Sequence, residues 1–167
     1  SKSSFRFTYT VPENEPDLKA IKNSVKNANG LVGSGVIELC RQADIVFLAL
    51  HGAAGENGQL QALFDLNEIN YTGSGYVGSL IAMDKDLSKR ILRDNGILTA
   101  DWTYINIKEN NDFNEILYPC VVKPCSCGSS VGVTMVENAT QLNTAIECAK
   151  KYEDSVIIEK KIEGREF

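Results

Sequence analysis

A lysine near the end of an apolar run is the first residue whose type and position point to chemistry. Lys123 stands in such a run, and a loop of small residues follows it, with Gly128 and Gly132 as its glycines and Ser129 and Ser130 between them. An ammonium group there is costly to remove from water unless an anion lies against it. Glycines let backbone amides approach a ligand, and serine hydroxyls add donors. The segment therefore fits polyphosphate binding, with a flexible hairpin whose lysine extends into solvent as the simpler alternative.

A second lysine has an unusual position for a purely structural residue. Lys85 lies in the first turn of a helix that is expected to begin near Asp84. The helix dipole disfavours a positive side chain there by up to about 1 kcal/mol. A functional need for the cation would explain this position, and so would its neutralisation by Asp84 and Asp86.

A glycine-rich segment carries the single histidine of the chain. His51 and Glu56 belong to the segment 51–58, which follows the apolar run 44–50. Such a run predicts a strand buried on both faces in a parallel sheet, and open α/β sheets bind ligands beyond the carboxyl ends of their strands. Segment 51–58 is therefore either a ligand site or a tight structural turn. The charged stretch 159–166, considered alone, is typical of a solvated connection.

Helices and strands must position these residues. The helices expected from apolar spacing cover residues 36–42, 59–67 and 84–94, with a surface helix within 13–35 and another helix after Asn138. Their apolar faces are expected to carry Leu18, Ile21 and Val25 in the surface helix, Leu87, Ile91 and Leu92 in 84–94, and Leu142, Ala145, Ile146 and Ala149 in the last. The expected strands are 44–50, 119–124, 131–136 and 155–159, the middle two as a hairpin-like pair. This order predicts an α/β fold of two units joined near residue 78.

The composition is that of an ordinary globular protein and excludes several partners. The 167 residues include 17 Lys and Arg against 22 Asp and Glu, so the net charge is −5 and no basic field exists to attract nucleic acid. No apolar run approaches the roughly 20 residues of a membrane-spanning helix, and residues 1–10 lack the core of a signal peptide. We expect a cytoplasmic protein without a nucleic-acid or membrane partner.

The five cysteines are expected to be free thiols. Cys120, Cys125 and Cys127 lie close together in the sequence, but their spacing matches no zinc motif and the single histidine is distant. An odd number of cysteines without an export signal also argues against a disulfide framework. We expect small buried thiols and no metal site.

Five motifs, taken together, resemble the D-alanine:D-alanine ligase family of ATP-grasp enzymes. In chain order they are Leu50-His-Gly-Ala-Ala-Gly-Glu-Asn-Gly58 with Gln61, Tyr71-Thr-Gly-Ser-Gly75, Ala82-Met-Asp-Lys85 with Lys89, Val122-Lys-Pro124 with Gly128-Ser-Ser-Val-Gly132, and Ile158-Glu-Lys160 with Gly164-Arg-Glu166. The resemblance implies a partial Rossmann-like (pre-ATP-grasp) domain over residues 1–78 and the first lobe of an ATP-grasp domain over residues 79–167. The second lobe is absent from the sequence, and we expect the chain to be a fragment of a longer enzyme.

The resemblance also implies an activity. Members of this family join two D-alanines in an ATP-dependent reaction that passes through an acyl phosphate, and the product dipeptide is used for peptidoglycan. D-alanine and ATP are then the partners, Mg²⁺ is held by residues outside this chain, and a homodimer is the assembly common in the family. A ligase that adds D-lactate or D-serine second is the nearest alternative. A nucleotide-binding module without chemistry is the alternative from another class, and the chain by itself is expected to be inactive.

Site roles follow from the resemblance position by position. Lys85 and Lys123 correspond to the two phosphate-contacting lysines, Ser129 to the loop serine that orients the first substrate, Gly128 and Ser130 to the flap over the phosphates, Glu159, Lys160 and Ile162 to the stretch that holds adenine, Glu166 to the carboxylate on the ribose, and His51 to a histidine of the first D-alanine pocket. The chain departs from the family in two places. The glutamate that grips the first D-alanine is not recognisable in the amino-terminal segment, and Ser126 and Cys127 stand where some members have an arginine and a glutamate.

Overall fold

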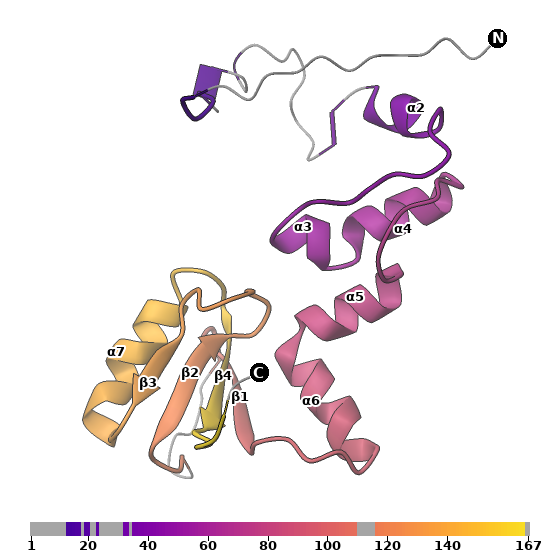
Figure 1. The fold of residues 1–167 in the computed structure, drawn as a ribbon. Helices are drawn as coiled ribbons and strands as arrows, with labels where there is room; N and C mark the ends of the chain where they lie inside the picture. Colours follow the sequence, from indigo (N-terminus) through magenta and orange to yellow (C-terminus); the bar gives the residue numbers. More distant parts are fainter. Residues whose placement is uncertain are drawn as a thin grey trace, which may run out of the picture. The chain divides into compact units, whose positions relative to one another are not determined.

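The computed structural model describes residues 13–17, 19–20, 23, 32–33, 35–109 and 116–165. The chain divides into two compact units, Ser1–Leu39 and Cys40–Phe167, and the sheet and helices α3 to α7 belong to the second (Figure 1). Helix α2 (Val36–Cys40) is two residues shorter than the predicted 36–42. The apolar residues of the predicted surface helix, Leu18, Ile21 and Val25, lie outside the described residues.

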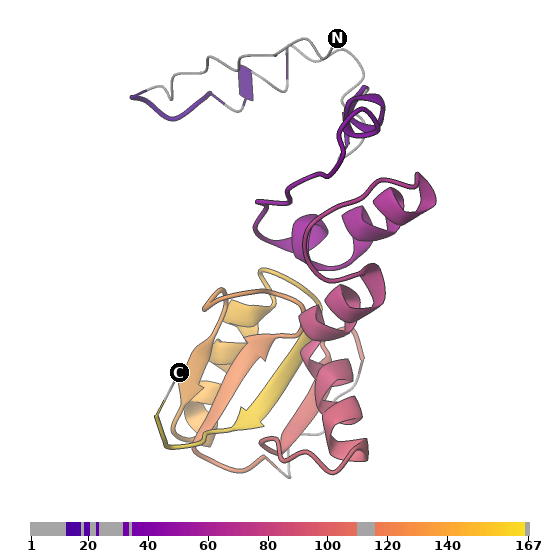
Figure 2. The ribbon, with the colours of Figure 1, turned by 45° about the vertical axis from the view of Figure 1, so that its right-hand side comes forward.

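A four-stranded antiparallel sheet with the strand order β1–β4–β2–β3 organises the second unit. Its strands are β1 (Trp102–Asn106), β2 (Cys120–Pro124), β3 (Thr134–Val136) and β4 (Ser155–Lys160). Helix α7 (Ala139–Ala149) packs against β2 and β3, as Figures 1 and 2 show. The two central strands are buried by their neighbours and by α7, so that Val122 and Val156 are fully enclosed. The predicted hairpin-like pair and the predicted last strand are both confirmed.

Helix α7 confirms the pattern from which it was predicted. Its stripe of Leu142, Ala145, Ile146 and Ala149 is buried in the core. Asn138 caps the helix, because its Oδ1 accepts from the backbone amide of Thr140 at 3.1 Å. Gln141 Oε1 accepts from the amide of Glu137 at 2.9 Å, one residue before the cap rather than at the cap itself. The amino-terminal end of α7 is therefore closed by two side chains.

Replacing Asn138 with alanine is expected to lower the free energy of unfolding by about 1 kcal/mol, because the first turn of α7 loses an acceptor for its amide groups. Denaturation by urea measures the change. Asn138→Asp is the matched control, since a carboxylate retains the acceptor and is expected to stay within about 0.5 kcal/mol of the wild type. Equal losses in both variants would contradict the cap.

Among the described residues, four consecutive helices lie between α2 and the sheet. They are α3 (Ala53–Glu56), α4 (Gln59–Leu66), α5 (Tyr76–Met83) and α6 (Lys85–Asp94). Helices α4 and α6 confirm the predicted 59–67 and 84–94 to within one residue at each end. Asp84 is the N-cap of α6, and Gly96 beyond its end has a φ of 72°, a left-handed conformation that suits a glycine after a helix. Helix α5 was not predicted. No helix in the described ranges is long and apolar enough to cross a membrane.

The predicted buried strand 44–50 is wrong. Within the described residues this segment makes one isolated parallel bridge, in which Val46 pairs with Tyr71. Its side chains Ile45, Phe47 and Leu50 are more than half exposed, at 57%, 76% and 54%. An apolar run reveals that a segment is suited to burial, but it does not reveal whether strands lie on both sides of it. The described part of the chain provides a neighbour on one side.

Candidate functional site

Lys85 is bound to the loop that follows β2. Its backbone amide donates to the carbonyl oxygen of Cys125 at 3.1 Å, and its ammonium group donates to the carbonyl oxygens of Cys125, at 3.1 Å, and of Cys127, at 2.5 Å. The two neighbouring carboxylates have other partners, since Asp84 caps α6 and Asp86 accepts from side chains of α6 and β1. The structure therefore favours a role for Lys85 at the loop over neutralisation by its neighbours.

Lys123 lies at a carboxylate that it shares with another lysine. Glu159 Oε2 is 3.1 Å from Lys123 Nζ and 3.4 Å from Lys89 Nζ. Strand β2 supplies Lys123, strand β4 supplies Glu159, and Lys89 comes from α6, one turn after Lys85. Strand β2 and helix α6 thus bring three ammonium groups to one region of the molecule, and β4 supplies the carboxylate.

Charge and burial act together on these lysines. Burial is the main cause that lowers the pKa of Lys85, and the positive charge of Lys123 lowers it further. Burial also lowers the pKa of Lys89, where the charge of Lys123 acts in the same direction and Glu159 opposes it. Like charges held this close repel one another, so an anion placed against them is stabilised. The cluster is therefore suited to bind a polyanion.

The apolar face predicted for α6 is partly wrong. Ile91, one of its three predicted inward residues, is 38% exposed, whereas Lys89 is 7% exposed and is the buried residue of the helix. Apolar spacing does not find a lysine of this kind, because a lysine is buried only where partners for its charge are present.

The loop that joins β2 to β3 is anchored at both ends. At its start, the amide of Ser126 donates to Glu153 Oε2 at 2.8 Å. At its end, Gly132 has a φ of 69°, and a Cβ atom there would lie 2.6 Å from Pro124 Cγ. The predicted site residues Gly128, Ser129 and Ser130 are exposed between these anchors. A loop with fixed ends and an exposed middle is suited to cover a ligand bound at the lysines.

The segment that carries His51 comes near this loop. The amide of Gly52 donates to Glu56 Oε2 at 2.6 Å, and a Cβ atom built on Gly128 would lie 3.8 Å from the same oxygen. His51 is exposed. Gly58 has a structural role, because it is buried with a φ of 88° and a Cβ atom there would lie 2.3 Å from the Tyr76 carbonyl oxygen. The segment thus combines a tight turn with residues placed beside the loop.

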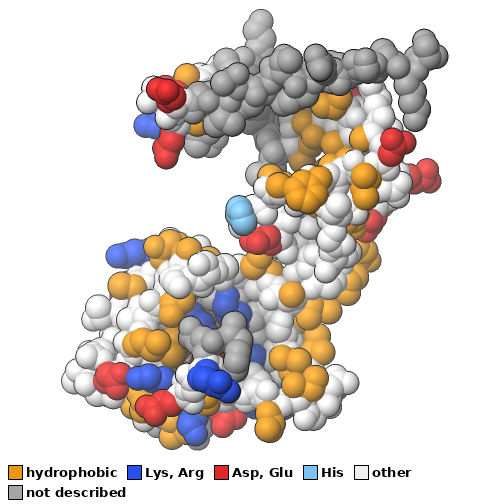
Figure 3. Space-filling model, viewed as in Figure 1, with side chains coloured by type: hydrophobic (Ala, Val, Ile, Leu, Met, Phe, Trp, Pro, Cys, Tyr) orange, Lys and Arg blue, Asp and Glu red, His pale blue; other side chains and the backbone are white. Residues whose placement is uncertain are grey.

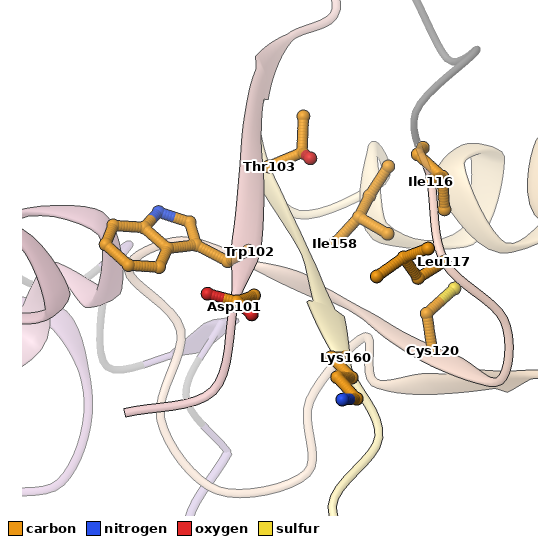
Figure 4. A pocket seen from close by; sticks show the side chains of 8 residues that line it. All are labelled: Asp101, Trp102, Thr103, Ile116, Leu117, Cys120, Ile158 and Lys160. Carbon is orange, nitrogen blue, oxygen red and sulfur yellow. The ribbon is translucent and has the colours of Figure 1, made fainter. Parts of the chain in front are cut away.

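Lys160 and Ile162 are the remaining predicted site residues that the structure describes, and no contact joins either of them to the lysine cluster. Side chains alternate along a strand, so Lys160 lies on the opposite face of β4 from Glu159. Its side chain lines a pocket of about 70 Å³, shown in Figure 4. The other lining residues are Asp101, Trp102, Thr103, Ile116, Leu117, Cys120 and Ile158. Ile162, beyond the end of β4, is 65% exposed, and Glu166 lies outside the described residues.

Two of the three clustered cysteines are buried thiols, as predicted. Cys120 and Cys125 are each 1% exposed, and Cys127 is half-buried. Burial raises the pKa of Cys125 to about 12. Among the residues that the structure describes, no three His, Cys, Asp or Glu side chains are grouped so that they could hold a metal ion.

Cys125 is expected to resist alkylation by iodoacetamide at pH 8, while the partly exposed Cys148 reacts. The thiolate is the reactive form, and a pKa of about 12, raised from 9.0, leaves very little thiolate at this pH. Peptide mass spectrometry after timed labelling measures both residues in one sample. Modification of Cys125 as fast as Cys148 would contradict this assignment.

Comparison with known proteins assigns the family. A model described as "D-ala D-ala ligase N-terminus" matches residues 3–74, and one described as "D-ala D-ala ligase C-terminus" matches residues 91–167. The D-alanine–D-alanine ligase of Pediococcus pentosaceus is 46% identical over 154 residues, which make up 92% of this chain and 43% of that protein. The chain belongs to the D-alanine–D-alanine ligase family. It spans about two fifths of the length of the curated relatives that it matches.

Solved structures of D-alanine–D-alanine ligases share the fold. The enzyme from Bacillus anthracis complexed with ATP aligns with a TM-score of 0.71 at 38% identity, covering 78% of this chain and 44% of that one. VanG D-Ala:D-Ser ligase from Enterococcus faecalis aligns with a TM-score of 0.65 at 33% identity, covering 73% and 37%. The predicted α/β fold, a partial Rossmann-like domain followed by the first ATP-grasp lobe, is thereby confirmed. The boundary near residue 78 stays a prediction.

Two residues of the site in this ligase-family chain were given no role from the sequence. Lys89 belongs to one of the quoted motifs, but its burial depends on partners that are distant in the chain. Glu153 lies between α7 and β4 and holds the start of the loop through the amide of Ser126 and, at 3.7 Å, through the thiol of Cys127. No local pattern marks a carboxylate that binds residues 26 and 27 positions away.

Proposed function

We propose that this chain is the amino-terminal and central part of an ATP-dependent ligase that joins two D-alanines into D-alanyl-D-alanine for peptidoglycan synthesis. The observation that carries the proposal is the convergence of Lys85 and Lys123 beside the loop between β2 and β3. Lys85 binds carbonyl oxygens of this loop, and Lys123 lies near enough to lower the pKa of Lys85. Membership of the family supports the choice of substrate, since the curated relatives are named D-alanine–D-alanine ligases.

In this proposal the lysines and the loop amides bind the phosphates of ATP. The carboxylate of the first D-alanine attacks the γ-phosphorus, the bond from that phosphorus to the bridging oxygen breaks, and ADP leaves. The amine of the second D-alanine then attacks the acyl phosphate, and the tetrahedral intermediate loses inorganic phosphate while the new amide nitrogen loses a proton. Phosphoryl transfer depends mainly on positioning and on stabilisation of charge, which cations and amides supply. Lys85 would exchange its carbonyl partners for phosphate oxygens.

The other site residues keep the roles that the resemblance implies. Ser129 orients the first D-alanine, His51 lines its pocket, Gly128 and Ser130 cover the phosphates, Glu159, Lys160 and Ile162 hold adenine, and Glu166 binds the ribose. The approach of the loop to Glu56 supports the roles of Ser129 and His51, because it brings the segment of His51 next to the phosphate-binding loop. The exposure of the loop supports the role of Gly128 and Ser130 in covering the phosphates, since a ligand can enter beneath the loop.

The remaining parts of the proposal concern the whole ligase. Mg²⁺ accompanies ATP in the proposed reaction, and the family resemblance assigns its ligands to residues outside this chain. We propose a cytoplasmic homodimer that binds neither nucleic acid nor membrane. The net charge of −5 supports the lack of a nucleic-acid partner.

The proposal is tested by incubating the full-length protein that carries this chain with ATP and D-alanine. We expect release of inorganic phosphate that depends on D-alanine, with D-alanyl-D-alanine identified by mass spectrometry, and no product from L-alanine. ATP binding without release of phosphate would contradict the proposal and favour a nucleotide-binding module without chemistry.

A second candidate substrate has support from one comparison. The similarity to VanG D-Ala:D-Ser ligase keeps D-serine open as the second substrate, and D-lactate is the other acceptor that the resemblance implies. Competition between D-alanine, D-serine and D-lactate in one reaction decides among them. We expect D-alanyl-D-alanine as the main product.

A further inference from the structure

Lys89 is a buried cation with a complete set of partners. Its ammonium group donates to Thr99 Oγ1 at 2.6 Å and to the carbonyl oxygen of Ala100 at 2.9 Å, and it lies 5.1 Å from the centre of the Trp102 ring. The fourth partner is Glu159 Oε2 at 3.4 Å. Helix α6 and the chain that leads into β1 therefore hold this side chain in one place.

The carboxylate of Glu159 connects Lys89 to the candidate phosphate site. The same oxygen, Oε2, forms an ion pair with Lys89 and with Lys123, and the side chains of Lys123 and Glu159 are only 22% and 19% exposed. A bridging oxygen in a partly buried place is screened weakly by solvent, so each lysine affects the other through it. Displacement of Lys89 would change the position of Lys123 and the strength with which Lys123 attracts a phosphate group.

The net charge of Lys89, Lys123 and Glu159 shows how Lys89 affects the attraction of Lys123 for phosphate. Lys89, Lys123 and Glu159 together carry one net positive charge, whereas Lys123 and Glu159 without Lys89 are neutral. The charge of Lys85, which lies on the same helix as Lys89, is separate from this balance. With Lys89 present, Glu159 divides its interaction between two cations, and Lys123 retains attraction for a phosphate group.

We propose that Lys89 is a positioning residue, which holds Glu159 so that Lys123 remains a phosphate-binding cation. Lys89 does not contact the nucleotide in this account, and it acts only through Glu159. The inference rests on the proposed function, because it assigns the phosphates of ATP to Lys123. Nothing in the family resemblance assigned a role to this lysine.

The test is a double-mutant cycle in the full-length protein, with Lys89→Met, Lys123→Met and the pair combined. Dissociation constants for ATP and for adenosine are measured by calorimetry. We expect Lys89→Met to weaken ATP binding about tenfold and adenosine binding by a clearly smaller factor, because Glu159 is also assigned to adenine but only ATP carries the phosphates that Lys123 binds. In the Lys123→Met background, Lys89→Met is expected to have almost no further effect on ATP, since residues that act through one another are not additive.

Further variants separate this role from a structural one. Lys150→Met is the matched control, because Lys150 pairs with Glu147 at 3.2 Å on the exposed side of α7. Lys89→Arg retains the cation and is expected to restore most of the ATP affinity, and Lys89→Gln replaces Lys89→Met if the latter does not fold. Equal losses of ATP and adenosine affinity, or independent effects of Lys89 and Lys123, would overturn the inference.

A measurement without nucleotide distinguishes the two proposals. The ¹⁵Nζ signal of Lys123, assigned by its loss in Lys123→Met, is expected to shift in Lys89→Met and to stay in place in Lys150→Met. A shifted signal in a protein that fails to bind ATP would support the coupling of Lys89 to Lys123 through Glu159 and would overturn the proposed function. An unmoved signal would overturn the inference itself.

Discussion

Replacing Lys123 with alanine is expected to lower the turnover of the full-length protein by at least about a hundredfold. A cation that meets charge developing on the transferred phosphoryl group is worth roughly this factor or more in a site closed to water. The loss is also expected to leave Glu159 without one of its two partners. Initial rates of phosphate release at saturating ATP and D-alanine measure the effect.

A matched lysine controls for non-specific effects of removing charge. Lys150→Ala removes an ammonium group that is 49% exposed and paired with Glu147, and we expect its turnover to stay within about twofold of the wild type. Lys123→Arg keeps the charge but changes its geometry, so we expect an intermediate rate. Near-normal turnover in Lys123→Ala would remove this residue from the site.

Replacing Gly58 with alanine is expected to destabilise the chain by about 3 kcal/mol or more. The backbone of Gly58 has a φ of 88°, which disfavours a side chain, and the new Cβ atom would lie 2.3 Å from the Tyr76 carbonyl oxygen. The start of α4 would have to move away from the start of α5. The midpoint and slope of urea denaturation measure the change.

Gly96 provides the control for backbone strain alone. It has a similar φ of 72°, but a Cβ atom there meets nothing within 4 Å, so Gly96→Ala is expected to cost only about 1 kcal/mol. The difference between the two variants isolates the steric conflict at Tyr76. Equal losses at the two glycines would show that no such conflict exists.

Local patterns predicted the elements that depend on local physics. The buried stripe of α7 and the start of α6 next to Asp84 follow from helical spacing, and both are present. Strand β1 was missed, although Trp102–Asn106 is rich in aromatic and β-branched residues, which favour a strand. Helix α5 was missed because Tyr76–Met83 contains glycine and serine and follows a turn-like segment, so its helical signal is weak.

The predictions that failed concern residues whose structure depends on partners distant in the sequence. The run 44–50 is apolar enough for a buried strand, yet Phe47 is 76% exposed in the structure. Lys89 is buried because Thr99, Ala100 and Glu159 surround its charge, and only the folded chain brings them together. Apolar side chains are also visible on the surface over helices α4, α5 and α6 (Figure 3). Leu66, Tyr76 and Leu80 are among the large apolar residues that are exposed on α4 and α5.

The sequence predicted the lysines and the loop of the candidate site, but not the contacts that join the lysines to one another. Spacing and resemblance marked Lys85 and Lys123, and the structure brings both beside the loop after β2. The sequence did not reveal that Glu159 joins Lys123 to Lys89, because strand register and helix packing determine that contact. The role of Lys160 in holding adenine stays a prediction, and its side chain lines the pocket on the opposite face of β4 from Glu159.

Labelling with an acyl-phosphate derivative of ATP tests the central claim most directly, because this reagent transfers its acyl group to lysine amines that lie beside the bound phosphates. We expect Lys85 and Lys123 to be the labelled residues, excess ATP to protect both, and Lys150 to react slowly with or without ATP. Labelling of other lysines with Lys85 and Lys123 unmodified, or labelling that ATP does not suppress, would contradict the convergence of these two cations on the triphosphate.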